Sequence, residues 1–230
     1  METAMTYRDT SRLLLFGQIA TVVCLIPVGL TLGALTGQVV LSPILGMALP
    51  LLAATWFLRR EGTSWQDLGF ARRMPLWRFL TFTTVAVVAV YLLVVLALQP
   101  ALEALGFPAP DVSGMRQLIE GNTMAYLLFL LPVSWGSAAF GEEMLVRGYI
   151  LNRAERLSHS AVWAVLIQAS IFGLAHSYQG ITGMLMIFTI GLILGAVFIR
   201  CGRNLWPVIV AHGLIDTIGI TALYLGWGIV

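Results

Sequence analysis

Charged side chains are scarce in this sequence. Of its 230 residues, 10% are Asp, Glu, Lys or Arg, whereas a soluble domain carries roughly 25%. Hydrophobic residues make up 59%, and so few charges could not cover that much apolar side chain in water. The composition therefore excludes an ordinary soluble domain and indicates that a lipid bilayer surrounds the chain.

Lysine is absent, so that all 13 basic residues are arginine. The net charge is only +2, and the arginines stand in short stretches between apolar runs rather than along one face of an element. This distribution excludes a nucleic-acid-binding surface. We attribute the missing lysine to genome composition and, because the chain is also compact and has no long loops, we predict a prokaryotic protein.

Cysteine is also rare, with Cys24 in an apolar run and Cys201 in a polar turn. Their positions exclude a structural disulfide, and their spacing does not indicate a metal site. The sequence contains no HExxH motif, no nucleophile elbow, and no Ser or Cys in an obvious catalytic partnership. Two familiar arrangements for hydrolysis, the HExxH zinc site and the serine hydrolase site, are thereby excluded.

Long apolar runs make up most of the chain. Because a membrane-spanning helix needs about 20 mostly apolar residues, we predict an all-α, multi-pass transmembrane bundle of about seven spans, or eight if one is split or re-entrant. We treat residues 1–230 as a single integral membrane domain, and we predict that the first run is a retained span because it is too long for a signal peptide. The predicted spans are 13–36, 38–58, 79–100, 124–150, 161–180, 182–199 and 207–228.

The arginines alternate between the two ends of the predicted spans. Cytoplasmic loops carry the excess of positive charge, so we predict a cytoplasmic N-terminus and an external C-terminus in a prokaryotic cytoplasmic membrane. The linker 59–78, in which Trp65 and Trp77 stand among arginines, is predicted to lie on membrane lipid as an amphipathic segment. The opposite loops hold only Arg116. The predicted cytoplasmic arginines are Arg8, Arg12, Arg59, Arg60, Arg72, Arg73, Arg78, Arg153, Arg156, Arg200 and Arg203.

Ionisable side chains within spans are costly and by default mark function. Here they occur only in the C-terminal half of the chain. Each of them could be structural if taken alone, as an ion pair, a core histidine or a helix–helix hydrogen bond. His159 lies in a loop and is given no role. Two acids and two histidines together favour a functional site, because packing alone could use neutral polar groups. The residues are Glu142, Glu143 and Arg147 in span four, His176 in span five, and His212 and Asp216 in span seven.

Helical spacing groups these residues further. Glu143 and Arg147 are four residues apart, which predicts an ion pair and leaves Glu142 the less neutralised acid. His212 and Asp216 also share a helix face. Counted at ~1.5 Å per residue, the three helices bring their polar groups to overlapping depths, which predicts a shared cavity on the cytoplasmic side.

A carboxylate and an imidazole in one cavity can activate water and then protonate a leaving amine. A second imidazole with a neighbouring acid can stabilise an oxyanion. Two histidines and one glutamate are also a legitimate zinc-binding set. The residues alone leave open whether the site works without a metal or with zinc.

The order EExxxR (Glu142 to Arg147), FxxxH (Phe172 to His176) and HxxxN/D (His212 to Asp216) resembles the CAAX-protease and bacteriocin-processing family of intramembrane endopeptidases, also called CPBP or Abi. The resemblance covers a core of about 124–220.

The resemblance implies a role for each of these residues. It implies that Glu142 and His176 activate water, that His212 and Asp216 form the oxyanion site, and that Glu143, Arg147 and Phe172 orient them. Well-described relatives have Asn where this chain has Asp216. Because an ionised Asp cannot donate a hydrogen bond, Asp216 would be protonated or would hold His212 in its donor tautomer.

The family has been described both as metalloproteases and as glutamate proteases. We favour chemistry without a metal cofactor, because Glu142 would otherwise serve as ligand and base at once. The alternative is zinc held by Glu142, His176 and His212. The expected partners are membrane lipid and a peptide or protein with a membrane-proximal cleavage site, other than a prenylated CAAX tail because bacteria rarely prenylate proteins.

Two other functions fit a buried cluster of this kind. A proton-coupled transporter would carry matched repeats in its two halves, and none is found here. A non-catalytic scaffold or immunity protein would retain the motifs for structure alone.

Overall fold

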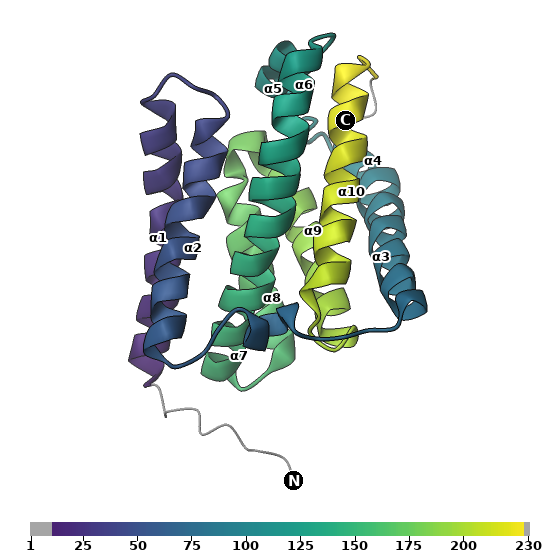
Figure 1. Cartoon of the computed structure of the whole chain (residues 1–230). Coiled ribbons are helices and arrows are strands. Elements are labelled where there is room, and N and C mark those ends of the chain that lie inside the picture. The colour runs from purple at the N-terminus through teal and green to yellow at the C-terminus, as the bar shows by residue number, and fades with distance from the viewer. Residues whose placement is uncertain (1–10, 228–230) are drawn as a thin grey trace.

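The computed structural model describes residues 11–227 and is a bundle of helices (Figure 1), with no strand among those residues. This confirms the predicted all-α class. Arg8 and the last residue of the predicted final span, 228, lie outside the described residues. The helices are α1 Arg12–Ala34, α2 Leu41–Arg60, η1 Gln66–Phe70, α3 Leu76–Val90, η2 Tyr91–Leu98, α4 Gln99–Ala104, α5 Ser113–Ile119, α6 Thr123–Leu128, η3 Phe129–Ile150, α7 Leu151–Ser158, α8 Ala161–Ala175, η4 Ser177–Gln179, α9 Gly180–Arg200 and α10 Leu205–Tyr224.

Several of these segments join end to end into longer helices. Six helices in the described residues are long and apolar enough to cross a membrane, and they establish an integral membrane protein. α8, at 15 residues, is the shorter apolar helix that would complete about seven spans. The six long helices are Arg12–Ala34, Leu41–Arg60, Leu76–Ala104, Thr123–Ser158, Ser177–Arg200 and Leu205–Tyr224.

The predicted fifth span, 161–180, ends earlier than expected. α8 stops at Ala175 because His176 leaves the helical conformation (φ −103°, ψ 17°) and a short turn, η4, follows. Gly180 then adopts φ +78°, a conformation that glycine reaches without strain. The early stop brings His176 to the end of a helix, inside the bundle rather than in the middle of a span.

The long helices run roughly parallel, so that the bundle has two ends (Figure 1). α1 and α2 form a pair on one side, the α3–α4 helix lies on the other, and the α6–η3–α7 helix and α10 lie between them. We call the end formed by linkers 61–75, 159–160 and 201–204 the arginine-rich end. The arginine-poor end is formed by α5 with the connections 35–40, 105–112, 120–122 and 225–227.

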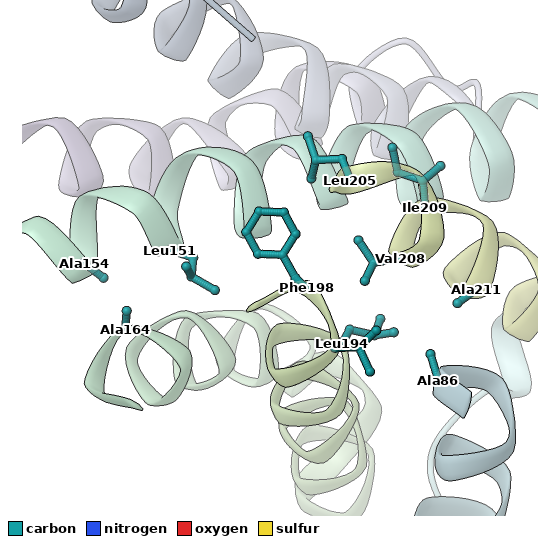
Figure 2. Packing of buried hydrophobic residues seen from close by; sticks show 11 residues of the cluster. Ala86, Leu151, Ala154, Ala164, Leu194, Phe198, Leu205, Val208, Ile209 and Ala211 are labelled. Carbon is teal, nitrogen blue, oxygen red and sulfur yellow. The ribbon is translucent and has the colours of Figure 1, made fainter. Parts of the chain in front are cut away.

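A buried apolar cluster fills the arginine-rich end of the bundle between α7, α8, α9 and α10. Figure 2 shows the Phe198 ring of α9 between Leu151, Leu205 and Val208, with Leu194 below it. Leu151, Leu205 and Val208 are fully buried and Phe198 is 2% exposed. Close packing of these side chains fills the space between the helices in this part of the bundle.

The linker between α2 and α3 packs partly into the bundle. Leu68 and Gly69 are buried, and the Trp65 indole N–H donates to the Thr55 hydroxyl at 2.9 Å. Gly69 has φ +137°, and a Cβ there would stand 2.6 Å from the Arg203 carbonyl oxygen. Trp77, by contrast, is 68% exposed. The first half of the predicted amphipathic segment therefore packs on protein, and its Trp77 end is free to face lipid.

Arg153, which the sequence places among the cytoplasmic loop charges, is fully buried. Its guanidinium donates to Gln18 Oε1 at 3.1 Å and to Glu61 Oε2 at 2.8 Å, and it lies 4.4 Å above the Tyr149 ring. These contacts join α1, α2 and α7. Since a buried charge must be paired, this cluster holds the α1–α2 pair on the bundle.

Gly191 of α9 allows α8 and α9 to approach closely. A Cβ at Gly191 would stand 2.9 Å from the Cα of Ala169, so Gly191→Val is expected to separate the helices at a cost of about 1–3 kcal/mol. Thermal unfolding in detergent measures the loss. Gly17→Val is the matched control, because a Cβ at Gly17 meets nothing within 4 Å. Equal unfolding temperatures for the two variants would contradict this account.

Candidate active site

Glu143 is the centre of a buried polar network between η3 and α10. Its carboxylate oxygen Oε1 accepts a hydrogen bond from Arg147 Nη1 at 2.8 Å and another from His212 Nδ1 at 2.8 Å. Glu143 and Arg147 are fully buried and His212 is 6% exposed. The i,i+4 ion pair is therefore part of a three-residue network, in which Glu143 also fixes the imidazole of the second helix.

Arg147 extends this network to α8 and α9. Its Nη2 donates to the Gly191 carbonyl at 3.4 Å, and Gln168 donates to the same carbonyl at 2.8 Å. The guanidinium carbon lies 4.7 Å above the ring of Phe172, a favourable cation–π geometry. The Phe172 ring in turn meets the rings of His176 and His212 edge-on, at 5.0 and 6.2 Å. Phe172 is thus a spacer that sets the positions of both histidines.

His176 is held by the last turn of α8. Its Nδ1 lies 2.9 Å from the carbonyl oxygen of Phe172. A carbonyl can only accept a hydrogen bond, so Nδ1 carries the hydrogen. The Nε2 of the neutral ring then has a free lone pair, which is what a proton acceptor or a water-orienting group requires.

In His212, as in His176, Nδ1 is held by a hydrogen bond, but its Nε2 faces a carboxylate. Nδ1 donates to Glu143, and Nε2 lies 3.7 Å from Asp216 Oδ1. Because Nδ1 already carries a hydrogen, Nε2 gains one only when the ring becomes a cation. Asp216 stands where it stabilises that cation. The residue that fixes the tautomer of His212 is therefore Glu143, a role that the sequence analysis considered only for Asp216.

A cavity of about 370 Å³ lies among η2, η3, η4, α9 and α10, and most of its lining is apolar. Its polar lining includes all four predicted catalytic residues, whereas Glu143 and Arg147 are not part of the lining. The Glu142 side chain forms no hydrogen bond or ion pair within residues 11–227, which leaves its carboxylate free to meet water. The predicted residues that line the cavity are Glu142, Phe172, His176, His212 and Asp216.

Three polar residues that the sequence analysis passed over also belong to this region. The Tyr91 hydroxyl, from η2, lies 3.4 Å from the Ile215 carbonyl and lines the cavity. The Tyr178 ring centroid is 5.8 Å from that of His176, and Gln168 supports the Gly191 carbonyl. Their sequence signal is weak, since each is a single polar or amphipathic residue next to an apolar run.

The cavity extends in the direction opposite to the predicted one. Beyond the catalytic groups its lining continues to Val112, Met115 and Trp227, all of which belong to the arginine-poor end. The lining thus extends away from the arginine-rich end, toward which the cavity was predicted from the sequence. The physical reason is the packing of Phe198 and its neighbours, which fill the space between the helices at that end.

The predicted alternative is a zinc ion held by Glu142, His176 and His212. Within residues 11–227, no three His, Cys, Asp or Glu side chains stand close enough to hold one metal ion. Glu142, His176 and His212 line the same cavity, and each imidazole has its Nδ1 engaged. In this arrangement the three side chains do not form a zinc-binding cluster.

Comparison with known proteins agrees with the resemblance noted in the sequence. Residues 124–218 match a family model described as type II CAAX prenyl endopeptidase Rce1-like. No curated protein and no solved structure matches the chain. The matched segment begins in α6 and ends in α10, so it contains the whole predicted catalytic set.

Proposed function

We propose, from the premise that residues 124–218 belong to the Rce1-like family of type II CAAX prenyl endopeptidases, that this chain is an intramembrane endopeptidase. It hydrolyses a peptide bond of a membrane-associated peptide or protein with a water molecule activated by Glu142 and His176. The observation that carries the proposal is the contrast between the two adjacent acids. Glu143 is neutralised by Arg147 and His212, whereas Glu142 faces the cavity without a partner in residues 11–227.

Glu142 is the general base in this mechanism. A water in the cavity donates one hydrogen to the Glu142 carboxylate and orients on the free Nε2 of His176. As the water oxygen attacks the peptide carbonyl carbon, Glu142 takes the proton and later gives it to the leaving amine nitrogen. The C–N bond then breaks, and the products are a carboxylic acid and an amine.

His212 stabilises the negative charge that develops on the carbonyl oxygen. With Nδ1 held by Glu143, its cationic form presents an Nε2–H to the cavity, and Asp216 at 3.7 Å compensates the positive charge. A donor fixed before the reaction is worth most where water is excluded. Asp216 thus acts through His212 rather than as a hydrogen-bond donor of its own.

The charge of the lining favours an internal peptide bond over a prenylated C-terminal tail. A CAAX tail ends three residues after its modified cysteine, so its terminal carboxylate would lie within about 10 Å of the cleaved bond. The cavity presents Glu142 and Asp216, and no arginine among the described residues lines it. A free carboxylate would therefore meet negative rather than positive side chains.

The proposal is tested with purified protein and quenched fluorescent peptides carrying a membrane anchor, each made with a free and with an amidated C-terminus. We expect the amidated peptides to be cut faster, a strong chelator to have no effect, and His176→Ala to lower the rate by about 10²–10⁴-fold. His159→Ala is the matched control, because His159 contacts Arg12 at the protein surface. Full activity in His176→Ala would contradict the assigned role, and inhibition by the chelator would replace this mechanism with a metal-dependent one.

A further inference from the structure

The direction in which the cavity opens determines which substrates reach the catalytic groups. From Glu142 and His212 the lining extends to Pro110 and Val112, just before and at the start of α5, and to Trp227, just after α10. These positions form the arginine-poor end of the bundle (Figure 1). A chain entering from this end meets an apolar passage before it reaches the acids.

The opposite end is closed by two layers of packed side chains. Nearest the site, Arg147 fills the space between η3 and α9 by its bond to the Gly191 carbonyl. Below it lies the cluster around Phe198 (Figure 2). An ion pair of 2.7 Å between Arg203 and Glu155 links the base of α10 to α7. Access from the arginine-rich end would require all of these contacts to open together.

The charge of the two ends assigns them to sides of the membrane. Of the arginines near the two ends of the bundle in residues 11–227, all lie at the arginine-rich end except Arg116 of α5. Arginine-rich loops remain in the cytoplasm. The arginine-poor end, with the mouth of the cavity, is then extracytoplasmic.

We infer that the cavity admits its substrate from the extracytoplasmic face of the membrane, and that this substrate is a membrane-anchored polypeptide whose cleavage region lies on that face. The reaction assumed for this substrate is the proposed endopeptidase function. The path of entry depends only on the packing and on the orientation of the bundle. A test of access therefore remains informative if no cleavage is found.

Access is measured with single cysteines in a Cys24→Ser, Cys201→Ser background. Ala138→Cys reports on the cavity, because Ala138 lines it one turn before Glu142, and Val133→Cys is a second cavity reporter. Gln38→Cys, in the α1–α2 connection, marks the arginine-poor end. Gln66→Cys, in η1, marks the arginine-rich end; both glutamines are exposed.

Each variant is treated with a charged, membrane-impermeant maleimide in intact spheroplasts and in inverted membrane vesicles. We expect the cavity reporters and Gln38→Cys to react about tenfold faster in spheroplasts, and Gln66→Cys to react faster in inverted vesicles, since a thiol reacts only where the reagent reaches it. Modified Ala138→Cys is expected to lose cleavage activity, which ties the labelled passage to catalysis.

Three results would overturn the inference. The first is cavity reporters that react together with Gln66→Cys from the cytoplasmic side. The second is reporters that react from neither side although the denatured protein is labelled. The third is Gln38→Cys reacting only in inverted vesicles, which would reverse the orientation of the bundle. Failure of the proposed function would look different. The cysteine variants would then be labelled as expected, but the wild-type protein would cut none of the anchored peptides.

Discussion

Replacing Glu142 by glutamine is expected to lower the rate of peptide cleavage by about 10²–10⁴-fold while the protein unfolds at its normal temperature. Glutamine has nearly the same shape as glutamate but cannot take up the proton of the attacking water. Glu142 has no hydrogen-bond or ion-pair partner within residues 11–227, so the substitution leaves no buried charge unpaired. Cleavage of the anchored peptides and thermal unfolding, measured on the same preparation, separate catalysis from stability.

Glu155→Gln is the matched control for this result. Glu155 pairs with Arg203 at 2.7 Å near the protein surface, where both side chains are about 30% exposed, and exposed ion pairs contribute little to stability. The control is expected to cleave normally. Activity retained in Glu142→Gln would show that the base is a different group, and the buried charges would then favour a scaffold or a proton relay.

Replacing Glu143 by leucine is expected to destabilise the protein by about 3–5 kcal/mol, because it leaves the buried charge of Arg147 without a partner. It also removes the acceptor that holds His212 Nδ1, so cleavage is expected to disappear together with stability. Substitutions of the two neighbouring acids are thus expected to differ in their effect on stability, although both lower cleavage. Substitution of Glu142 lowers the rate of cleavage at unchanged stability, and substitution of Glu143 lowers the stability of the protein as well.

The double variant Glu143→Leu, Arg147→Met distinguishes these roles. Apolar replacement of both members of a buried ion pair is often neutral for stability, so the double variant is expected to unfold at a higher temperature than Glu143→Leu alone. Its cleavage activity is expected to remain lost, since His212 still lacks its acceptor. Together with the single variants Glu143→Leu and Arg147→Met, the double variant gives the coupling energy. A Glu143→Leu protein as stable as wild type would contradict the role of Glu143 as the centre of the network.

Composition and spacing were enough to predict the membrane environment, the all-helical fold and the candidate site. The scarcity of charge required a bilayer, and a few ionisable residues in apolar runs stood out for the same reason. The spacing of Glu143 from Arg147 predicted their pairing, because residues four apart on a helix are neighbours whatever surrounds them. Local rules of this kind depend on the backbone geometry of one helix, and that geometry is encoded in the adjacent sequence.

Contacts between distant helices could not be obtained in this way. Glu143 and His212 are 69 residues apart, and no periodicity indicates that a second helix presents its imidazole to the first. The same applies to Tyr91 in the cavity wall, to the burial of Arg153 and to the end of α8 at Ala175. The direction of the cavity depends on how well Phe198, Leu205 and Val208 fill the space between three helices. Packing density is a property of side chains that meet in three dimensions, so the open end of this site became apparent only from the assembled bundle.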